Sequence, residues 1–221
     1  MNGSHGIAQP VRRREDVRLL TGQGRFADDV SQQGQLYAAF VRSPVAHGII
    51  RNVNLAAASA AAGVVDVFTG DDLAAAGIGH IVARWPKYQS AQIQSARPLH
   101  TPRPGLAQGK VRHVGEAVVM VVAETLGQAR GAADLVTLEI DELPAAVTIA
   151  DAIAPGAPEV WEDAPGNIGQ VWHRGDRQAA DDAFSKASHV SHLSLINNRI
   201  VATPMEPRTS LASWDGESER F

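Results

Sequence analysis

The sequence predicts an α+β fold in which short strands alternate with short helices. The expected strands are apolar or alternating runs, and residues 48–55, GIIRNVNL, illustrate the alternation. The expected helices are rich in alanine, and each begins at a capping residue or ends at a glycine. Of the 221 residues 44% are apolar, which is enough for a core, and the length favours one domain plus part of a second.

The first third of the chain is expected to alternate between strands and helices. The strands cover residues 35–43, 48–55 and 64–70, and the helices cover residues 55–63 and 71–77. Pro44 follows the first strand and stops its pairing. Gly63 closes the first helix, while Asp71 and Gly77 are the expected N-cap and C′ residues of the second.

Residues 81–110 interrupt this regularity. The stretch contains four prolines and no sustained hydrophobic period. Loops of this length in compact domains are usually functional or flexible. We therefore expect a long ordered loop or a connection between lobes, with a mobile surface loop as the alternative.

The strongest local pattern is a strand–helix–strand unit. The apolar run EAVVMVVAE at 116–124 predicts a strand that is buried on both faces. Thr125 and Gln128 form a capping box for a helix over 126–136, and an alternating strand over 136–145 follows. The expected buried side of this helix consists of the small residues Ala129, Ala132, Ala133 and Val136.

The composition changes after Pro144. Residues 148–170 are rich in Ala, Pro and Gly, which predicts a linker. The elements expected beyond it are a helix over 175–187, with Asp176 as N-cap, and a strand over 189–204. These patterns place a domain boundary within 155–170, and the chain is expected to reach Phe221 with its second domain only begun.

Charge and composition exclude several classes of function. The net charge of -4 gives no electrostatic reason to expect binding to nucleic acid or to an anionic membrane. Cysteine is absent, so the chain can form no disulfide and no Cys-ligated zinc or iron–sulfur centre. Neither a bilayer-spanning apolar run nor a secretory signal is recognisable. A soluble, cytoplasmic protein is expected.

Motifs for nucleotide binding and nucleophilic catalysis are not found. Gly22 and Gly24 lack the third glycine and the preceding apolar strand of a dinucleotide site. No GxxxxGK and no GxSxG occurs. Ser43 ends a strand, where a lone serine is expected to be structural.

The histidines and paired acids are expected to be structural or solvated. His189 and His192 lie in strand-like sequence, where residues three apart point to opposite faces. The pairs Asp28–Asp29, Asp71–Asp72 and Asp181–Asp182 are sequence neighbours and are interpreted as caps and solvated faces.

Two other charged features have open interpretations. Arg12, Arg13 and Arg14 form a solvated basic cluster or, alternatively, an anchor to an acidic partner surface. Glu206 lies between two prolines, and a buried salt bridge to Arg208 or another Arg is the expected structural role. The residues themselves thus indicate no catalytic, cofactor-binding or metal-binding site.

Five sequence blocks nevertheless resemble one family. They are VRRREDVRLLTGQGRFADDV, YAAFVRSPVAHGII, GVVDVFTGDDL, VRHVGEAVVMVVAETLGQARGAADLVTLEIDELPA and NRIVATPMEPRTSLASWD. In this order and spacing they resemble the large, molybdenum-bearing subunits of the xanthine dehydrogenase / aldehyde oxidase / carbon monoxide dehydrogenase family. The resemblance implies an α/β-hammerhead domain over 1–160 and the incomplete beginning of the first molybdopterin-binding domain over 166–221.

The resemblance also implies a chemistry that this chain does not complete. The family oxidises small carbon substrates with water-derived oxygen at a molybdenum–pterin cofactor, here expected in its cytosine dinucleotide form. Electrons pass to [2Fe–2S] clusters and FAD on a small and a medium subunit, in a dimer of heterotrimers. The family's cofactor loop, substrate loop and catalytic glutamate are expected beyond Phe221, so the chain alone is expected to be an inactive scaffold that binds no cofactor. The alternative is a stand-alone structural or interaction module without catalysis.

Overall fold

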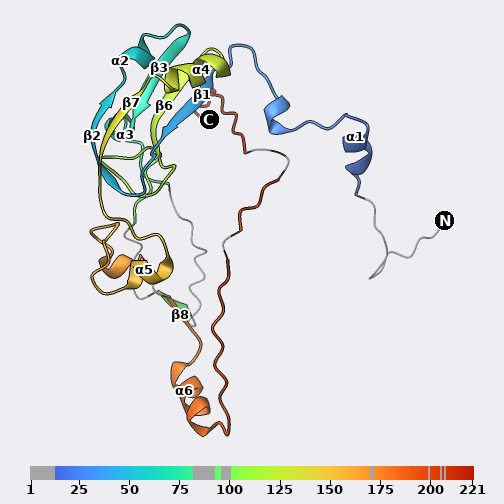
Figure 1. The fold of residues 1–221 in the computed structure, drawn as a ribbon. Coiled ribbons are helices and arrows are strands. Elements are labelled where there is room, and N and C mark those ends of the chain that lie inside the picture. The colour runs from blue at the N-terminus through green and yellow to red at the C-terminus, as the bar shows by residue number, and fades with distance from the viewer. Residues whose placement is uncertain are drawn as a thin grey trace, which may run out of the picture. The chain divides into compact units, whose positions relative to one another are not determined.

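The computed structural model describes residues 13–81, 93–95, 101–169, 172–198, 200–204, 206 and 208–221. The chain divides into two compact units. The larger unit is Leu36–His192, and the smaller unit combines Met1–Gln35 with Leu193–Phe221 (Figure 1). Strands and helices alternate along the larger unit, and the predicted α+β class is confirmed.

The strands described in the larger unit form three antiparallel groups. The first sheet has the order β1-β6-β3, with β1 at Tyr37–Arg42, β6 at Ala117–Ala123 and β3 at Val64–Thr69. The second has the order β5-β2-β7, with β5 at Lys110–Val111, β2 at Gly48–Asn54 and β7 at Thr137–Glu142. The third is the pair of β4 at Ile93–Ser95 and β8 at Trp172–Arg174.

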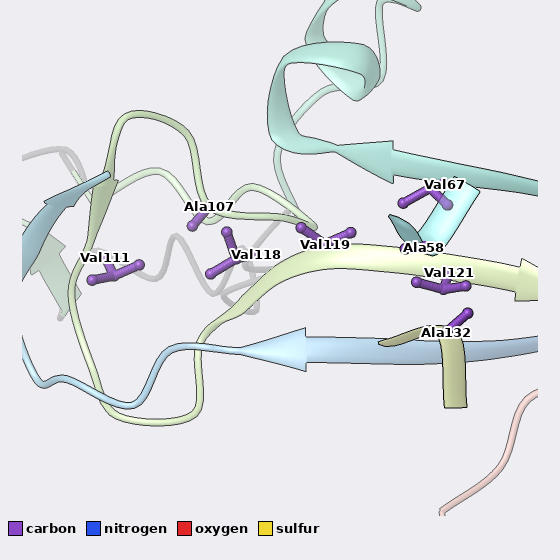
Figure 2. Close-up of a cluster of buried hydrophobic side chains, with 8 residues drawn as sticks. All are labelled: Ala58, Val67, Ala107, Val111, Val118, Val119, Val121 and Ala132. Carbon is purple, nitrogen blue, oxygen red and sulfur yellow. The ribbon is translucent and has the colours of Figure 1, made fainter. Parts of the chain in front are cut away.

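Strand β6 is the centre of the core, as its continuous apolar run predicts. It pairs with β1 on one side and β3 on the other, so its backbone is satisfied along both edges. Val121 packs in one cluster with Val67 of β3 and with Ala58 and Ala132 of two helices (Figure 2). The cluster continues along β6 through Val119 to Val118, Ala107 and Val111 (Figure 2). Burial is therefore confirmed for the face of Val119 and Val121, whereas Met120 and Val122 on the other face are only half-buried, so the expected burial on both faces is confirmed in part.

The helices of the larger unit are short. They are α2 at Ala56–Ser59, α3 at Gly70–Ala75, α4 at Leu126–Ala133, α5 at Ile149–Ile153 and α6 at Arg177–Lys186, with a 3-10 turn η2 at Pro165–Asn167. Helix α2 is shorter than the expected 55–63, because the chain turns after Ser59. Gly63 has a φ of 78° and is covered by the side chain of Gln128, where a Cβ would not fit.

Helix α4 connects the two main sheets. The Thr125 hydroxyl accepts a hydrogen bond from the Gln128 backbone N–H at 3.2 Å, as the capping pattern predicts. The Gln128 side chain does not bond back to the Thr125 N–H, so the capping box is incomplete. Instead, its Oε1 accepts a hydrogen bond from the Thr125 hydroxyl at 2.7 Å, and the side chain lies over Gly63. The expected strand–helix–strand unit exists, but β6 belongs to the first sheet and β7 to the second.

The N-cap of α3 is Thr69, and the prediction of Asp71 is wrong. Thr69 has extended backbone and its hydroxyl accepts from the N–H of Asp72, while the Asp72 carboxylate accepts from the N–H of Thr69 at 2.7 Å. The helix starts earlier than expected because this reciprocal pair forms as soon as β3 leaves its ladder. Gly77 has a φ of 73° directly after the C-cap, which confirms its C′ role.

Asp72 makes the stability of this cap depend on pH. Hydrogen bonds from the Thr69 hydroxyl, and then from its backbone N–H, hold the pKa of Asp72 below its usual value. A lowered folded-state pKa stabilises the fold above the unfolded pKa, and this contribution disappears as the pH falls through the folded pKa. We expect Asp72→Ala to lower the free energy of unfolding at pH 7, with a difference from wild type that shrinks below about pH 4. Denaturation at several pH values measures this; Asp71→Ala is the matched control, and an equal pH-dependent effect there would contradict the assignment.

The segment before β5 belongs to the core. Leu106 and Ala107 are buried, and the Ala107 N–H donates to the Ala117 carbonyl at 2.8 Å. The burial of Leu106 and Ala107 favours the ordered loop over the mobile surface loop at these residues, while the rest of the expected loop lies largely outside the described residues. Leu106 and Ala107 are apolar and lie beside Ala117, the first residue of β6, which explains why they are buried.

Residues 148–169, expected as a linker, contain α5 and η2 and are held by local hydrogen bonds. Asn167 is the centre of this segment: its Nδ2 donates to the carbonyls of Ala152 at 2.8 Å and Pro158 at 3.0 Å. Its Oδ1 accepts from the Val160 N–H at 2.9 Å. A φ of 58° allows Asn167 to reach all three groups, a conformation that asparagine adopts more readily than most residues.

The end of the larger unit has an exposed helix. Asp176 caps α6 by accepting from the Ala179 N–H at 2.9 Å, as predicted. The described part of 189–204 contains no strand, and that prediction is wrong for these residues. Alternating apolar residues are not sufficient to form a strand, because a strand also needs a partner strand for its backbone hydrogen bonds.

The smaller unit contains helix α1 at Asp16–Leu20 and a 3-10 turn η1 at Ala27–Asp29. Its two sequence segments meet where the Glu206 carboxylate accepts from the Ala27 N–H at 3.1 Å. Near the C-terminus, Trp214 packs edge-to-face on Phe221, and Asp215 pairs with Arg220 through backbone hydrogen bonds. Within the described residues of both units, no helix has the length and apolar character needed to cross a membrane.

Candidate functional site

One polar cluster joins the end of β5 to Trp161 and Glu162. The Arg112 guanidinium lies 3.7 Å from the ring centre of Trp161, a short cation–π contact. Lys110 forms an ion pair with Glu162, and its hydrogen bond holds the pKa of Glu162 below its usual value. The Arg112 backbone N–H donates to the Glu116 carboxylate at 2.5 Å. We call this set Lys110, Arg112, Trp161 and Glu162 the elbow contact.

His47 fixes a second junction. Its side chain is only 5% exposed, and Nδ1 lies 2.8 Å from the carbonyl oxygen of Pro144. Because a carbonyl only accepts, Nδ1 carries the proton. The backbone of His47 also accepts from the Leu143 N–H at 2.9 Å, so the residue holds the exit of β7 against the start of β2. Its Nε2 is buried without a partner among the described residues.

A groove runs beside the edge strand β1. It has a volume of about 430 Å³ and lies between β1 and α4. Its lining residues are Ala38, Ala39, Phe40 and Arg42 of β1 with Leu126, Arg130, Ala133 and Asp134 of α4 and its end. We call it the edge groove. The Arg42 guanidinium contacts the Phe40 ring at 5.7 Å and donates to the Gly115 carbonyl at 2.9 Å.

A second hollow lies where β2 approaches the start of α3. Its volume is about 310 Å³, and its charged lining residues are Arg51 and Asp71. Arg51 already pairs with Asp141 at 2.6 Å. The hollow is bordered by the backbones of Gly70 and Gly109 and offers no convergent set of charges to a ligand.

The residues considered from the sequence do not come together in one site. Ser43 is buried, and its hydroxyl donates to the Val45 carbonyl at 2.8 Å, so it is structural as expected. Gly22 lies in a turn after α1 with a φ of 73°, and no described strand precedes it. His189 contacts Ser191 at 3.1 Å rather than His192.

The paired acidic residues make caps or exposed side-chain contacts. Asp29 accepts from the Phe26 N–H at 3.0 Å, and Asp182 accepts from the Gln178 side chain at 2.9 Å. The expected buried salt bridge of Glu206 is wrong: the residue is exposed, and its partner is a backbone N–H. The described part of the chain shows no ion pair of Glu206. Arg13 and Arg14 are exposed, whereas Arg12 lies outside the described residues.

Sequence reasoning missed Arg112, Trp161 and His47. Their roles depend on contacts that join segments far apart in the chain, and spacing does not encode such contacts. Phe40 and Arg130 of the edge groove were missed for the same reason. The available signal was the unusual combination of a strand-flanking Arg with a Trp–Glu pair in an Ala/Pro/Gly-rich stretch.

The described residues contain no cluster of metal-ligating side chains. No group of three or more His, Asp or Glu side chains converges among them, and cysteine is absent from the sequence. The ordered features are instead contacts between segments, namely the elbow contact, the His47 junction and the edge groove.

Comparison with known proteins decides the family. Residues 21–144 match the model of the aldehyde oxidase and xanthine dehydrogenase a/b hammerhead domain. The chain belongs to this family. The matched residues of the hammerhead domain include β1, β2, β3, β5, β6, α4 and β7, that is, both main sheets and the helix between them.

Individual relatives agree with this assignment. The chain is 38% identical to the nicotine 6-hydroxylase large subunit of Paenarthrobacter nicotinovorans, over 97% of this chain and 25% of the relative. It is 33% identical to the xanthine dehydrogenase molybdenum-binding subunit of Escherichia coli O157:H7, over 67% of this chain and 19% of the relative. The crystal structure of quinoline 2-oxidoreductase from Pseudomonas putida 86 superposes with a TM-score of 0.59 at 38% identity, over 68% of this chain and 18% of that one. The chain thus spans about a quarter or less of the length of these relatives.

Proposed function

We propose that this hammerhead chain is the N-terminal part of the large subunit of a molybdenum hydroxylase-type oxidoreductase. The observation that carries the proposal is the family match over residues 21–144, extended by 38% identity to a hydroxylase large subunit over 97% of the chain. The chain's share of the function is that of a scaffold. The hammerhead domain would extend over 1–160, and residues 166–221 would begin the molybdopterin-binding domain.

The elbow contact and the His47 junction support the scaffold role. The elbow contact joins Trp161 and Glu162 to the end of β5, and the His47 junction holds Pro144 at the exit of β7, so the segment after β7 is attached to the hammerhead sheets at both points. The molybdenum–pterin cofactor, in its cytosine dinucleotide form, would be held by the rest of the subunit. FAD and [2Fe–2S] clusters would lie on a medium and a small subunit, in a cytoplasmic dimer of heterotrimers.

The overall reaction would be hydroxylation of a ring carbon. When bound, the cofactor supplies the two-electron oxidation in which substrate R–H and water give R–OH, two protons and two electrons. The electrons would leave through the clusters to FAD. Two relatives at 38% identity carry names that refer to N-heteroaromatic substrates, nicotine and quinoline, which favours an N-heteroaromatic ring here.

The test is to purify the native assembly and measure its composition and activity. We expect stoichiometric molybdenum, about four irons per molybdenum as two [2Fe–2S] clusters, and flavin. With an N-heteroaromatic substrate in ¹⁸O-labelled water, the product should carry the label. A particle of the chain's own mass that lacks molybdenum, iron and flavin would contradict the proposal and favour a stand-alone structural module.

A further inference from the structure

The edge groove lies at an open edge of a sheet. In the first sheet β1 occupies one end of the strand order, and β6 is its partner among the described residues. Natural proteins usually protect such edges with proline, lysine, a bulge or a covering segment. The β1 sequence, YAAFVR, contains no proline or lysine, and its pairing irregularity lies at its last residue pair, Val41/Arg42. The edge is therefore competent for further pairing.

The alternation of side chains defines the two faces of this edge. Ala39 pairs with Val121, whose side chain packs with Ala132 of α4. Phe40 pairs with Met120 and therefore points to the opposite face, where it is 44% exposed. A strand beside β1 would place alternate side chains toward α4 and the intervening ones beside Phe40.

One face of helix α4 lines the edge groove and would contact the added strand. Leu126, Arg130, Ala133 and Asp134 follow the helical spacing of one face and line the groove. Leu126 is 39% exposed, although it is a large apolar residue. Arg130 takes part in none of the ion pairs found among the described residues, and neither does Asp134.

The charges of Arg130 and Asp134 indicate which side chains a strand in the edge groove should carry. One helical turn separates Arg130 from Asp134, about 6 Å, and residues i and i+2 of a strand are about 7 Å apart. The complementary strand therefore carries a carboxylate opposite Arg130 and a hydrogen-bond donor two residues away opposite Asp134. A second copy of β1 is a poor match, because YAAFVR has no carboxylate and would bring Arg42 of both copies into the contact.

We propose that a strand from the rest of the large subunit, outside this chain, adds to β1 and fills the edge groove. Main-chain hydrogen bonds to β1 would supply affinity, and Arg130, Leu126 and Phe40 would select the side chains. The inference rests on the proposed function, because only a longer large subunit contains the additional strand. The chain spans 25% of the nicotine 6-hydroxylase large subunit, and the proposed subunit would be of similar length.

The test is site-specific photo-crosslinking in the assembled enzyme. A benzoylphenylalanine replaces Phe40, and the crosslinked peptide is identified by mass spectrometry. We expect one extended segment of the same polypeptide, beyond residue 221 and containing an acidic residue. The same probe at Val65, an exposed residue on the opposite edge strand β3, is the control and should not capture that segment.

A charge reversal at Arg130 is the second part of this test. Arg130→Glu should lower the Phe40 crosslink yield about tenfold or more, because like charges would then face each other. Arg177→Glu on the exposed helix α6 is the matched control and should leave the yield unchanged. Capture of another subunit or of a second copy, no capture above the Val65 level, or a yield insensitive to Arg130→Glu would overturn the proposal.

Molybdenum content of the same sample separates the two proposals. Molybdenum-loaded enzyme without the crosslink overturns strand addition and leaves the proposed function intact. The crosslink in a molybdenum-free protein supports strand addition while contradicting the proposed function.

Discussion

Replacing Gly70 by alanine is expected to lower the free energy of unfolding by about 2–3 kcal/mol, although Gly70 lies in a helix, where alanine normally stabilises. An added Cβ would lie well within 3.0 Å of the Ala107 carbonyl oxygen. That oxygen has little freedom to move, because the Ala107 N–H is bonded to Ala117 and the Gln108 side chain donates to the Gly70 carbonyl at 3.1 Å. Chemical denaturation followed by circular dichroism measures the change.

Gly131→Ala is the control, because the same substitution is expected to raise the free energy of unfolding at this position. Gly131 lies within α4, and apart from its chain neighbours and the backbone of its own helix, no atom lies within 4 Å of the position that its Cβ would take. Gly131→Ala should therefore raise the free energy of unfolding by about 0.5–1 kcal/mol through the lower entropy of the unfolded chain. Equal effects of the two substitutions would show that the approach of α3 to Ala107 is not a tight contact.

The sequence predicted the parts of the fold that depend on local signals. The apolar run of β6 and the N-caps Thr125 and Asp176 were correct, because one segment contains all the information they need. The prediction of Asp71 as the N-cap of α3 failed for a physical reason. Thr69 and Asp71 can both cap a helix, and the point where β3 leaves its ladder decides between them.

The parts that sequence could not predict depend on partners far away in the chain. Strand β6 pairs with β1 and β3 while β7 joins β2, and no periodicity specifies this arrangement. Glu206 was expected to bind an arginine, yet it meets the Ala27 N–H across 179 positions. The edge groove likewise arises from β1 and α4, which are separated by most of the domain.

Asn167→Ala is expected to have the largest local effect on the segment that leaves the hammerhead domain. The substitution removes three side-chain hydrogen bonds of about 1 kcal/mol each. It also places alanine at a φ of 58°, which costs about 1 kcal/mol more. The opening of residues 148–167 should become easier by about 4 kcal/mol, which corresponds to a roughly thousandfold faster hydrogen exchange at the Val160 amide. Hydrogen exchange measured by mass spectrometry or NMR follows this amide directly.

Asn167→Gly separates the backbone contribution from the side-chain contribution. Glycine keeps the positive φ at no steric cost but makes none of the three bonds, so its effect should be smaller than that of alanine by about 1 kcal/mol. Amides of β6 should exchange as in wild type in both variants, because the sheet core does not depend on Asn167. If the β6 amides accelerate together with Val160, the segment is part of one cooperative unit with the sheets. The elbow contact of Arg112 with Trp161 would then open only together with the sheets.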